Sequence, residues 1–126
     1  MRDELPEFTQ LLAGRPEAVA ILARQLRSAA LDGMPDLMER FYPGWQGLGW
    51  RHPDGGLLGT LFARDEDVVI YFERGAQLPD PHGMLGGHGR LRQTRTLTFP
   101  PGVATPSTTH LVEYLDIALD YAASHR

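Results

Sequence analysis

Apolar side chains recur every three or four positions in residues 16–32, the spacing of a helix with one buried face. Pro16 suits the first position of this predicted helix because its fixed φ is already helical. Gly33 and Pro35 predict where the helix ends, since glycine favours the position after a helix and proline cannot continue one.

The same spacing over residues 109–126 predicts a second long helix, and Ser107 or Thr109 can cap its N-terminus. Shorter helical pieces are expected over residues 8–14 and 35–41. The chain therefore begins and ends in helix.

Between these segments, apolar and β-branched runs separated by turn residues predict four strands. Short connections join the first three, which favours antiparallel hairpins. The third run is apolar almost throughout, which indicates an interior strand, whereas the fourth is rich in threonine and is expected at or near an edge. The four ranges are residues 47–52, 57–63, 67–73 and 91–99.

This order predicts an α+β fold in which the N-terminal and C-terminal helices pack on one face of an antiparallel sheet. No repeat or linker divides the chain, so residues 1–126 are expected to form one domain. Leu58, Thr60 and Phe62 alternate along their strand and are expected to share a face. The predicted core comprises Leu22, Leu26, Phe62, Val68 or Val69, Ile70, Phe72, Leu115 and Leu119.

Composition narrows the possible functions. The 126 residues contain no cysteine, which excludes disulfides, thiolate catalysis and cysteine-bound metals. The formal net charge of −4 gives no electrostatic support for nucleic-acid binding. All 12 basic residues are arginine, which excludes a Schiff-base lysine and a P-loop lysine. Without a membrane-length apolar run, and with an acidic start, the chain is expected to be cytoplasmic and to avoid membranes.

Residues 74–90 form a long segment between two predicted strands that follows neither helical nor strand periodicity. Its glycines could point backbone N–H groups at an anion, and arginine binds anions bidentately. The alternative is a structural crossover whose glycines supply positive φ and whose aspartate binds local N–H groups. The candidate ligand-binding residues are Arg74, Asp80, His82, His88 and Arg90.

We expect this loop to be ordered, because Leu78, Met84 and Leu85 need burial. Pro79 and Pro81 remove the donors on either side of Asp80. We therefore expect its carboxylate to accept a downstream N–H, such as that of Gly83. At least one residue among Gly83, Gly87 and Gly89 is expected at positive φ.

Three carboxylates share one face of the last predicted helix at i, i+3 and i+7 and are the candidate metal ligands: Glu113, Asp116 and Asp120. A solvated helix face is the alternative, as it is for the acidic turn at residues 65–67. On the first long helix, Arg24 and Arg27 are expected to face outward and to repel cations. We therefore expect ferrous iron to bind weakly or not at all, and any bound iron to lie at these acidic groups.

Motifs for catalysis are missing from the sequence. The three serines lie outside any G-x-S-x-G elbow, and no glycine-rich pattern opens directly onto a helix as dinucleotide binding requires. No carboxylate pair stands out for acid–base work. A non-enzymatic role is the expectation.

The loop resembles the hallmark of the bacterial YdhG-like family, in which a strand ending in an aromatic residue precedes a G-A-x-L-x-D-P-x-G-L-L-x-G-x-G-K pattern. The likeness extends over nearly the whole chain, including the family's P-x-L-x-E step at residues 35–39. Gly86, His88 and Arg90 depart from the customary glutamate, small hydroxyl residue and lysine. The matching loop residues are Phe72, Gly75, Ala76, Leu78, Asp80, Pro81, Gly83, Leu85, Gly87 and Gly89.

The resemblance implies a frataxin-like fold with two helices on an antiparallel sheet, and it implies an iron-chaperone role by analogy with one member of the family. Iron is accordingly the one cofactor that it suggests. From sequence, the favoured function is a non-enzymatic binding or carrier module for metal or a small anionic ligand. The alternatives are a small enzyme using the loop at residues 74–90, and a protein-interaction module. The sequence does not name the ligand, the partner or the oligomeric state.

Overall fold

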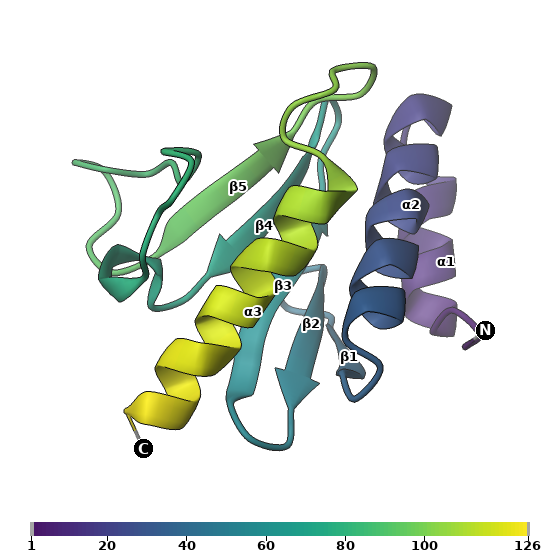
Figure 1. Ribbon diagram of the computed structural model, residues 1–126. Helices are drawn as coiled ribbons and strands as arrows, with labels where there is room; N and C mark the ends of the chain where they lie inside the picture. The colour runs from purple at the N-terminus through teal and green to yellow at the C-terminus, as the bar shows by residue number, and fades with distance from the viewer. Residues whose placement is uncertain (1, 126) are drawn as a thin grey trace.

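The computed structural model describes residues 2–125. Figure 1 shows α2 (Glu17–Gly33) and α3 (Thr108–Ser124) side by side on one face of a single sheet, with α1 (Pro6–Ala13) packed outside α2. The sheet is an antiparallel meander whose strands lie in chain order. They are β1 (Met38–Tyr42), β2 (Gly47–His52), β3 (Gly56–Ala63), β4 (Val68–Phe72) and β5 (Arg95–Phe99). The predicted α+β fold is confirmed.

The expected helix at residues 35–41 is wrong, because β1 begins at Met38 and is a fifth strand. Its seven residues are too few for a stable helix without caps, since the first turn of a helix is costly to nucleate. As a strand, the same residues place Glu39 and Phe41 opposite Trp50 and Leu48 on the helix-covered side of the sheet. β2, β3 and β4 match the predicted ranges to within one residue at each end. β5 lies at the edge, as predicted, but begins at Arg95, four residues later than expected.

A β-bulge separates Leu58 from the face expected for it. The β2–β3 register runs from Trp50↔Gly59 to Arg51↔Leu57, so Leu58 is the extra residue. The bulge turns Leu58 into the core, while Thr60 and Phe62 stay on the opposite, open face of the sheet. Phe62 is therefore not a core residue, and the three side chains do not share a face.

The core lies between the sheet and the helices and contains Trp50, Tyr114 and Phe8 among its largest fully buried side chains. On β4 the alternation sends Val68, Ile70 and Phe72 toward the helices. Of the predicted core, Val68, Leu26, Ile70, Phe72 and Leu115 are buried in this cluster, and Leu22 and Leu119 pack against it half-buried. Val69 is buried outside the cluster.

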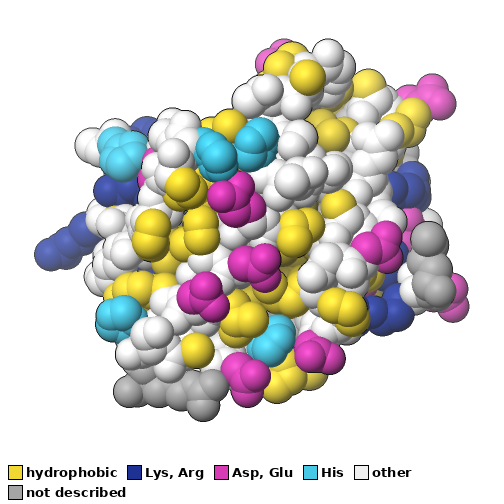
Figure 2. All heavy atoms as spheres, in the orientation of Figure 1, with side chains coloured by type: hydrophobic (Ala, Val, Ile, Leu, Met, Phe, Trp, Pro, Cys, Tyr) yellow, Lys and Arg dark blue, Asp and Glu magenta, His cyan; other side chains and the backbone are white. Residues whose placement is uncertain are grey.

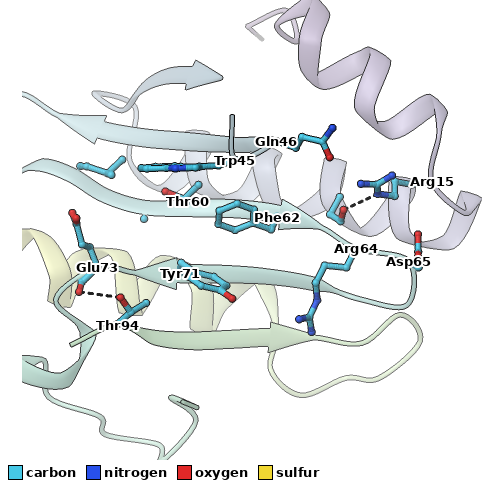
Figure 3. A pocket seen from close by; sticks show the side chains of 13 residues that line it. Arg15, Trp45, Gln46, Thr60, Phe62, Arg64, Asp65, Tyr71, Glu73 and Thr94 are labelled. Carbon is cyan, nitrogen blue, oxygen red and sulfur yellow. Dashed lines mark hydrogen bonds between the residues drawn. The ribbon is translucent and has the colours of Figure 1, made fainter. Parts of the chain in front are cut away.

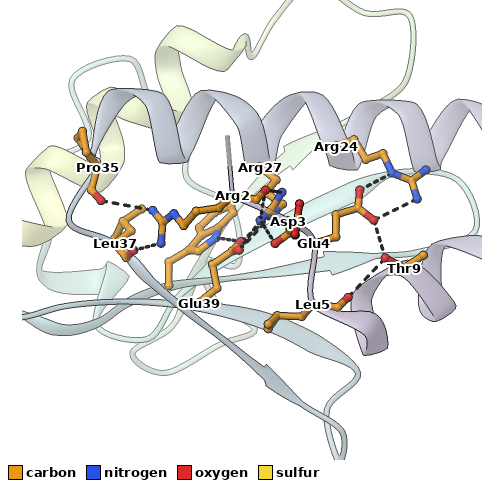
Figure 4. Close-up of polar contacts among 11 residues, drawn as sticks. Arg2, Asp3, Glu4, Leu5, Thr9, Arg24, Arg27, Pro35, Leu37 and Glu39 are labelled. Atoms are coloured by element: carbon orange, nitrogen blue, oxygen red, sulfur yellow. Dashed lines mark hydrogen bonds and ion pairs between the residues drawn. The ribbon is translucent and has the colours of Figure 1, made fainter.

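One ion pair is buried inside this core. Arg27 is 6 % exposed, and its Nη2 lies 2.7 Å from Glu39 Oε1 (Figure 4). Its remaining donors reach the carbonyl oxygens of Arg2 and Asp3. Trp50 Nε1 donates to Glu39 Oε2 at 3.2 Å. The expectation that Arg27 faces outward is therefore wrong, because Glu39 on β1 provides it with a buried partner.

Among the residues that the structure describes, no helix has the length and apolarity needed to cross a membrane.

Replacing Glu39 by Gln should cost about 3–5 kcal/mol of unfolding free energy, because the change leaves the Arg27 charge buried without a counter-ion. Urea denaturation followed by tryptophan fluorescence measures this loss. Glu4→Gln is the matched control: it breaks the exposed Arg24–Glu4 pair and should cost at most about 1 kcal/mol.

The double variant Arg27→Met/Glu39→Gln removes the unpaired charge and should recover most of the loss. Equal costs for Glu39→Gln and Glu4→Gln would contradict the structural importance of the buried pair.

Candidate functional site

The loop between β4 and β5 is tied to the sheet by its backbone. The short 3-10 helix η1 (Gly75–Gln77) follows β4, and Ala76 N–H donates to the Gln93 carbonyl at 2.8 Å. Gly75 lies so close to Arg95 that a Cβ at residue 75 would be 2.7 Å from the Arg95 nitrogen. Farther on, Gly86 and Thr96 exchange two backbone hydrogen bonds of 2.7 and 3.0 Å, so the loop pairs with the free edge of β5.

Asp80 holds the middle of the loop. Its carboxylate accepts the N–H groups of Met84 at 2.9 Å and Leu85 at 3.2 Å, and the hydroxyl of Tyr114 on α3 at 2.5 Å. The prediction that the Asp80 carboxylate accepts N–H groups from downstream residues is therefore correct. The Gly83 N–H, however, donates to the Asp80 carbonyl oxygen and not to the carboxylate. The positive φ of Gly83, +63°, turns the chain so that the next two N–H groups point at the Asp80 carboxylate.

This arrangement shifts two pKa values. Burial alone would raise the pKa of Asp80, but the hydrogen bonds from Tyr114, Met84 and Leu85 outweigh it and lower the pKa. Burial, with the hydrogen bond to Asp80, raises the pKa of Tyr114 to about 12. Asp80 is therefore an ionised anchor between loop and helix.

The other expectations for the loop are confirmed. Leu85 is buried, and Leu78 and Met84 pack half-buried against the core. Gly87 and Gly89 join Gly83 at positive φ. These features belong to an ordered crossover.

Only part of the candidate ligand-binding set lies together. Asp80 and His82 both hydrogen-bond to Tyr114, and the charge of His88 helps to lower the pKa of Asp80. Arg74, His88 and Arg90 are exposed. Arg74 lines a hollow of about 600 Å³ beside the β2–β3 hairpin and the end of α3, and the lining of that hollow does not include Asp80, His82, His88 or Arg90. Figure 1 shows the loop extending beside β5, away from α2.

His82 joins the last helix. Its Nε2 lies 2.7 Å from Glu113 Oε1, and its ring centroid lies 4.9 Å from that of His110. His110 in turn accepts the Ser107 N–H at its Nδ1, so it closes the N-terminus of α3 in a capping box. The predicted cap at Ser107 is confirmed, and His110 completes it.

The three candidate metal ligands do not gather into one cluster on α3. Figure 2 shows acidic side chains scattered among apolar ones on the face that carries this helix. Glu113 is engaged by His82, while burial and the nearby charge of Asp120 raise the pKa of Asp116. Within residues 2–125, no three histidine or acidic side chains are grouped closely enough to hold a metal ion.

A second concavity lies on the open face of the sheet, opposite the long helices. It encloses about 690 Å³ over β3 and β4, with Thr60, Phe62 and Tyr71 at its floor (Figure 3). Phe62 and Tyr71 form an edge-to-face pair with ring centroids 4.9 Å apart. We call this concavity the sheet-face hollow.

Two glycines of β2 shape this face. A Cβ on Gly47 would lie 2.8 Å from both Phe62 Cε1 and Thr60 Cγ2, and one on Gly49 would overlap the ring of Tyr42. Glycine at both positions lets aromatic side chains from the neighbouring strands lie flat across β2. The sequence "GLGW" thus places its glycines on the open face and Leu48 and Trp50 in the core.

The β1–β2 turn forms one wall. Trp45 is 57 % exposed and stacks on Tyr42 with ring centroids 4.9 Å apart. The next residue, Gln46, has a φ of +54°, which is uncommon outside glycine. Figure 3 shows Trp45 above Thr60, with Gln46 beside it.

Charged groups stand at the ends of the sheet-face hollow. Arg15, Arg64 and Asp65 lie near the C-terminal end of β3, and Glu73 lies beyond the C-terminal end of β4. Arg64 is held by Asp67, with Nε–Oδ1 and Nη2–Oδ2 distances of 2.6 and 2.7 Å. The sequence interpretation missed this site. The signal in the sequence was the alternation of Gly47 and Gly49 with the core residues Leu48 and Trp50 along β2.

No family model, curated protein or solved structure matches this chain. The YdhG-like assignment therefore remains a prediction from the loop motif.

Replacing Asp80 by Ala should cost about 1.5–3 kcal/mol of unfolding free energy at neutral pH, the usual contribution of hydrogen bonds to a charged group. Because folding lowers the pKa of Asp80, its stabilisation is complete above the unfolded pKa of about 3.9. It is lost as pH falls through the folded value. The difference between wild type and variant in urea denaturation should therefore shrink in acid.

Arg90→Ala is the matched control in the same loop and should leave stability unchanged, because Arg90 is exposed. Loss of stability in Arg90→Ala, or an unchanged stability in Asp80→Ala, would contradict the crossover interpretation.

Proposed function

We propose that this protein is a non-enzymatic binding module for a small organic ligand that lies in the sheet-face hollow. One observation carries the proposal: a concavity of about 690 Å³ with an aromatic floor opens on the face of the sheet that the long helices leave uncovered. Ligand pockets of proteins are typically about 300–1,000 Å³ and mostly apolar, with a few polar groups that orient the ligand.

The ligand should have a flat apolar body. Trp45, Phe62 and Tyr71 offer ring surfaces along the hollow, and such surfaces favour offset or edge-to-face contacts with another ring. Thr60 at the floor and Gln46 at the wall add hydrogen-bonding groups. This proposal agrees with the sequence in expecting a small ligand, but it places the ligand on the open face of the sheet and not in the loop at residues 74–90.

The loop supports a ligand site less well. The Asp80 carboxylate is used by three donors of the protein itself, and the arginines at the two ends of the loop do not share a concavity. The iron-carrier role rests on the family resemblance alone. Glu113 is occupied by His82, and Asp116 and Asp120 are left as a pair one turn apart.

A protein-interaction surface is also less well supported. Four large apolar side chains of the described residues are strongly exposed, and only Trp45 among them lines the hollow. An interface for a stable partner would need a broader apolar patch. The other three exposed side chains are Ile21, Met38 and Val103.

The test uses the neutral fluorescent probe N-phenyl-1-naphthylamine, whose emission rises in apolar sites. Saturable binding by the wild-type protein is expected. Trp45→Ala should weaken it about three- to tenfold, the loss expected when one aromatic contact is removed. Ile21→Ala is the matched control, since Ile21 is exposed to a similar degree, 49 %, but lies on α2 outside the hollow.

Amide resonances of β3 and β4 should shift on titration. Absence of saturable binding, or an equal loss in Ile21→Ala, would contradict the proposal.

A further inference from the structure

Arg15 is positioned differently from the other arginines. It lies in the connection between α1 and α2 and reaches round the end of the sheet, where its Nε donates to the Ala63 carbonyl at 2.8 Å (Figure 3). Ala63 is the last residue of β3, so this bond fixes the guanidinium at the end of the sheet-face hollow. A planar group held by one nitrogen has its remaining donors oriented in advance.

The terminal nitrogens of Arg15 have no hydrogen bond or ion pair within the described part of the chain. Arg24, Arg27 and Arg64 each pair with a carboxylate. Arg95, half-buried like Arg15, has its Nη1 on the carbonyls of Leu91 and Thr94. The other arginines that the structure describes without a carboxylate partner are exposed. Arg15 is therefore a half-buried cation that lines a concavity and has donors to spare, and partial burial strengthens its attraction for an anion.

The charges nearby favour Arg15 over Arg64 as the binding group. Arg64 stands at the same end, but Asp67 occupies its fork with two short hydrogen bonds. Asp65 also lines this end and is exposed, and it does not pair with Arg15 among the described contacts. The negative charge of Asp65 should weaken the binding of an anion to Arg15 without preventing it, since exposed charges are screened by solvent.

We infer that the ligand of the sheet-face hollow carries an oxyanion, such as a carboxylate or a phosphate, that binds Arg15 while its flat body lies over Phe62 and Tyr71. This inference rests on the proposed function, because it names the ligand class of the same site. The separation of roles is structural: the apolar floor lies on β3 and β4, and the cation comes from the α1–α2 connection.

Two related probes separate the charge from the ring. 1-Anilinonaphthalene-8-sulfonate carries an anionic group on the same ring framework as neutral N-phenyl-1-naphthylamine. Arg15→Gln should weaken the binding of the sulfonate probe about tenfold or more, which is the loss expected when a charge-assisted hydrogen bond is removed. It should leave the neutral probe unchanged. Arg92→Gln, an exposed arginine outside the hollow, is the control and should change neither.

Two further variants sharpen the result. Arg15→Lys should be intermediate, because lysine keeps the charge and loses the bidentate fork. Asp65→Asn should tighten the binding of the sulfonate probe, because it removes a carboxylate that repels the sulfonate group. Competition by 1-naphthoate and by 1-naphthyl phosphate then distinguishes a carboxylate from a phosphate as the preferred anion.

The outcomes are distinguishable. If the neutral probe binds and Arg15→Gln leaves the sulfonate probe unchanged, the inference about the anion is overturned while the proposed function stands. If neither probe binds the wild-type protein, the proposed function and this inference both fall. If the Arg15→Gln variant binds neither probe and unfolds at a lower urea concentration than the wild type, Arg15 has a structural role and the inference is again overturned.

Discussion

The buried pair of Arg27 and Glu39 is the interaction on which the rest of the structure depends. It joins α2 to β1, and Arg27 extends the connection to the carbonyls of Arg2 and Asp3 while Glu39 receives Trp50 Nε1. Burying two charges is costly and is repaid only when their remaining donors and acceptors are satisfied, as they are here. The pair thereby fixes β1 as an added edge strand. The turn that follows β1 carries Trp45, so the wall of the sheet-face hollow depends on an ion pair on the other side of the sheet.

A second anchor, Asp80, explains why the loop at residues 74–90 looks like a site in the sequence. Glycines at positive φ, two prolines and a lone carboxylate are what an anion-binding loop would contain, and they are also what a tight crossover needs. The two uses differ in where the donors point. Here the N–H groups of Met84 and Leu85 and the hydroxyl of Tyr114 converge on the protein's own carboxylate. Local N–H groups that are satisfied internally are not available to a ligand, so the loop serves to join β4 to β5 and to brace α3.

The sequence predicted the layers and the long helices because those depend on periodicity, which is local. It failed at residues 35–41, where Glu39 and Arg27 are twelve positions apart and only the fold shows that they pair. It failed at Phe62 because one bulged residue, Leu58, shifts the faces of β3, and nothing in the alternation marks the bulge. The candidate site was missed for a related reason. The residues of the sheet-face hollow come from the α1–α2 connection, the β1–β2 turn and two central strands, and they have no spacing in common.

Two features of the open face argue that it is more than the exposed side of a two-layer fold. An antiparallel sheet with one solvated face usually places polar side chains there, yet β3 and β4 present Phe62 and Tyr71, and Gly47 and Gly49 leave space for aromatic rings to lie across β2. Trp45 is also held over that face by a turn whose next residue, Gln46, adopts a conformation costly for a non-glycine residue. The stacking of Trp45 on Tyr42 offsets part of this cost, yet more than half of the tryptophan surface stays exposed. A ligand that fills the hollow would bury that ring and the floor beneath it, and would account for the apolar composition of the face.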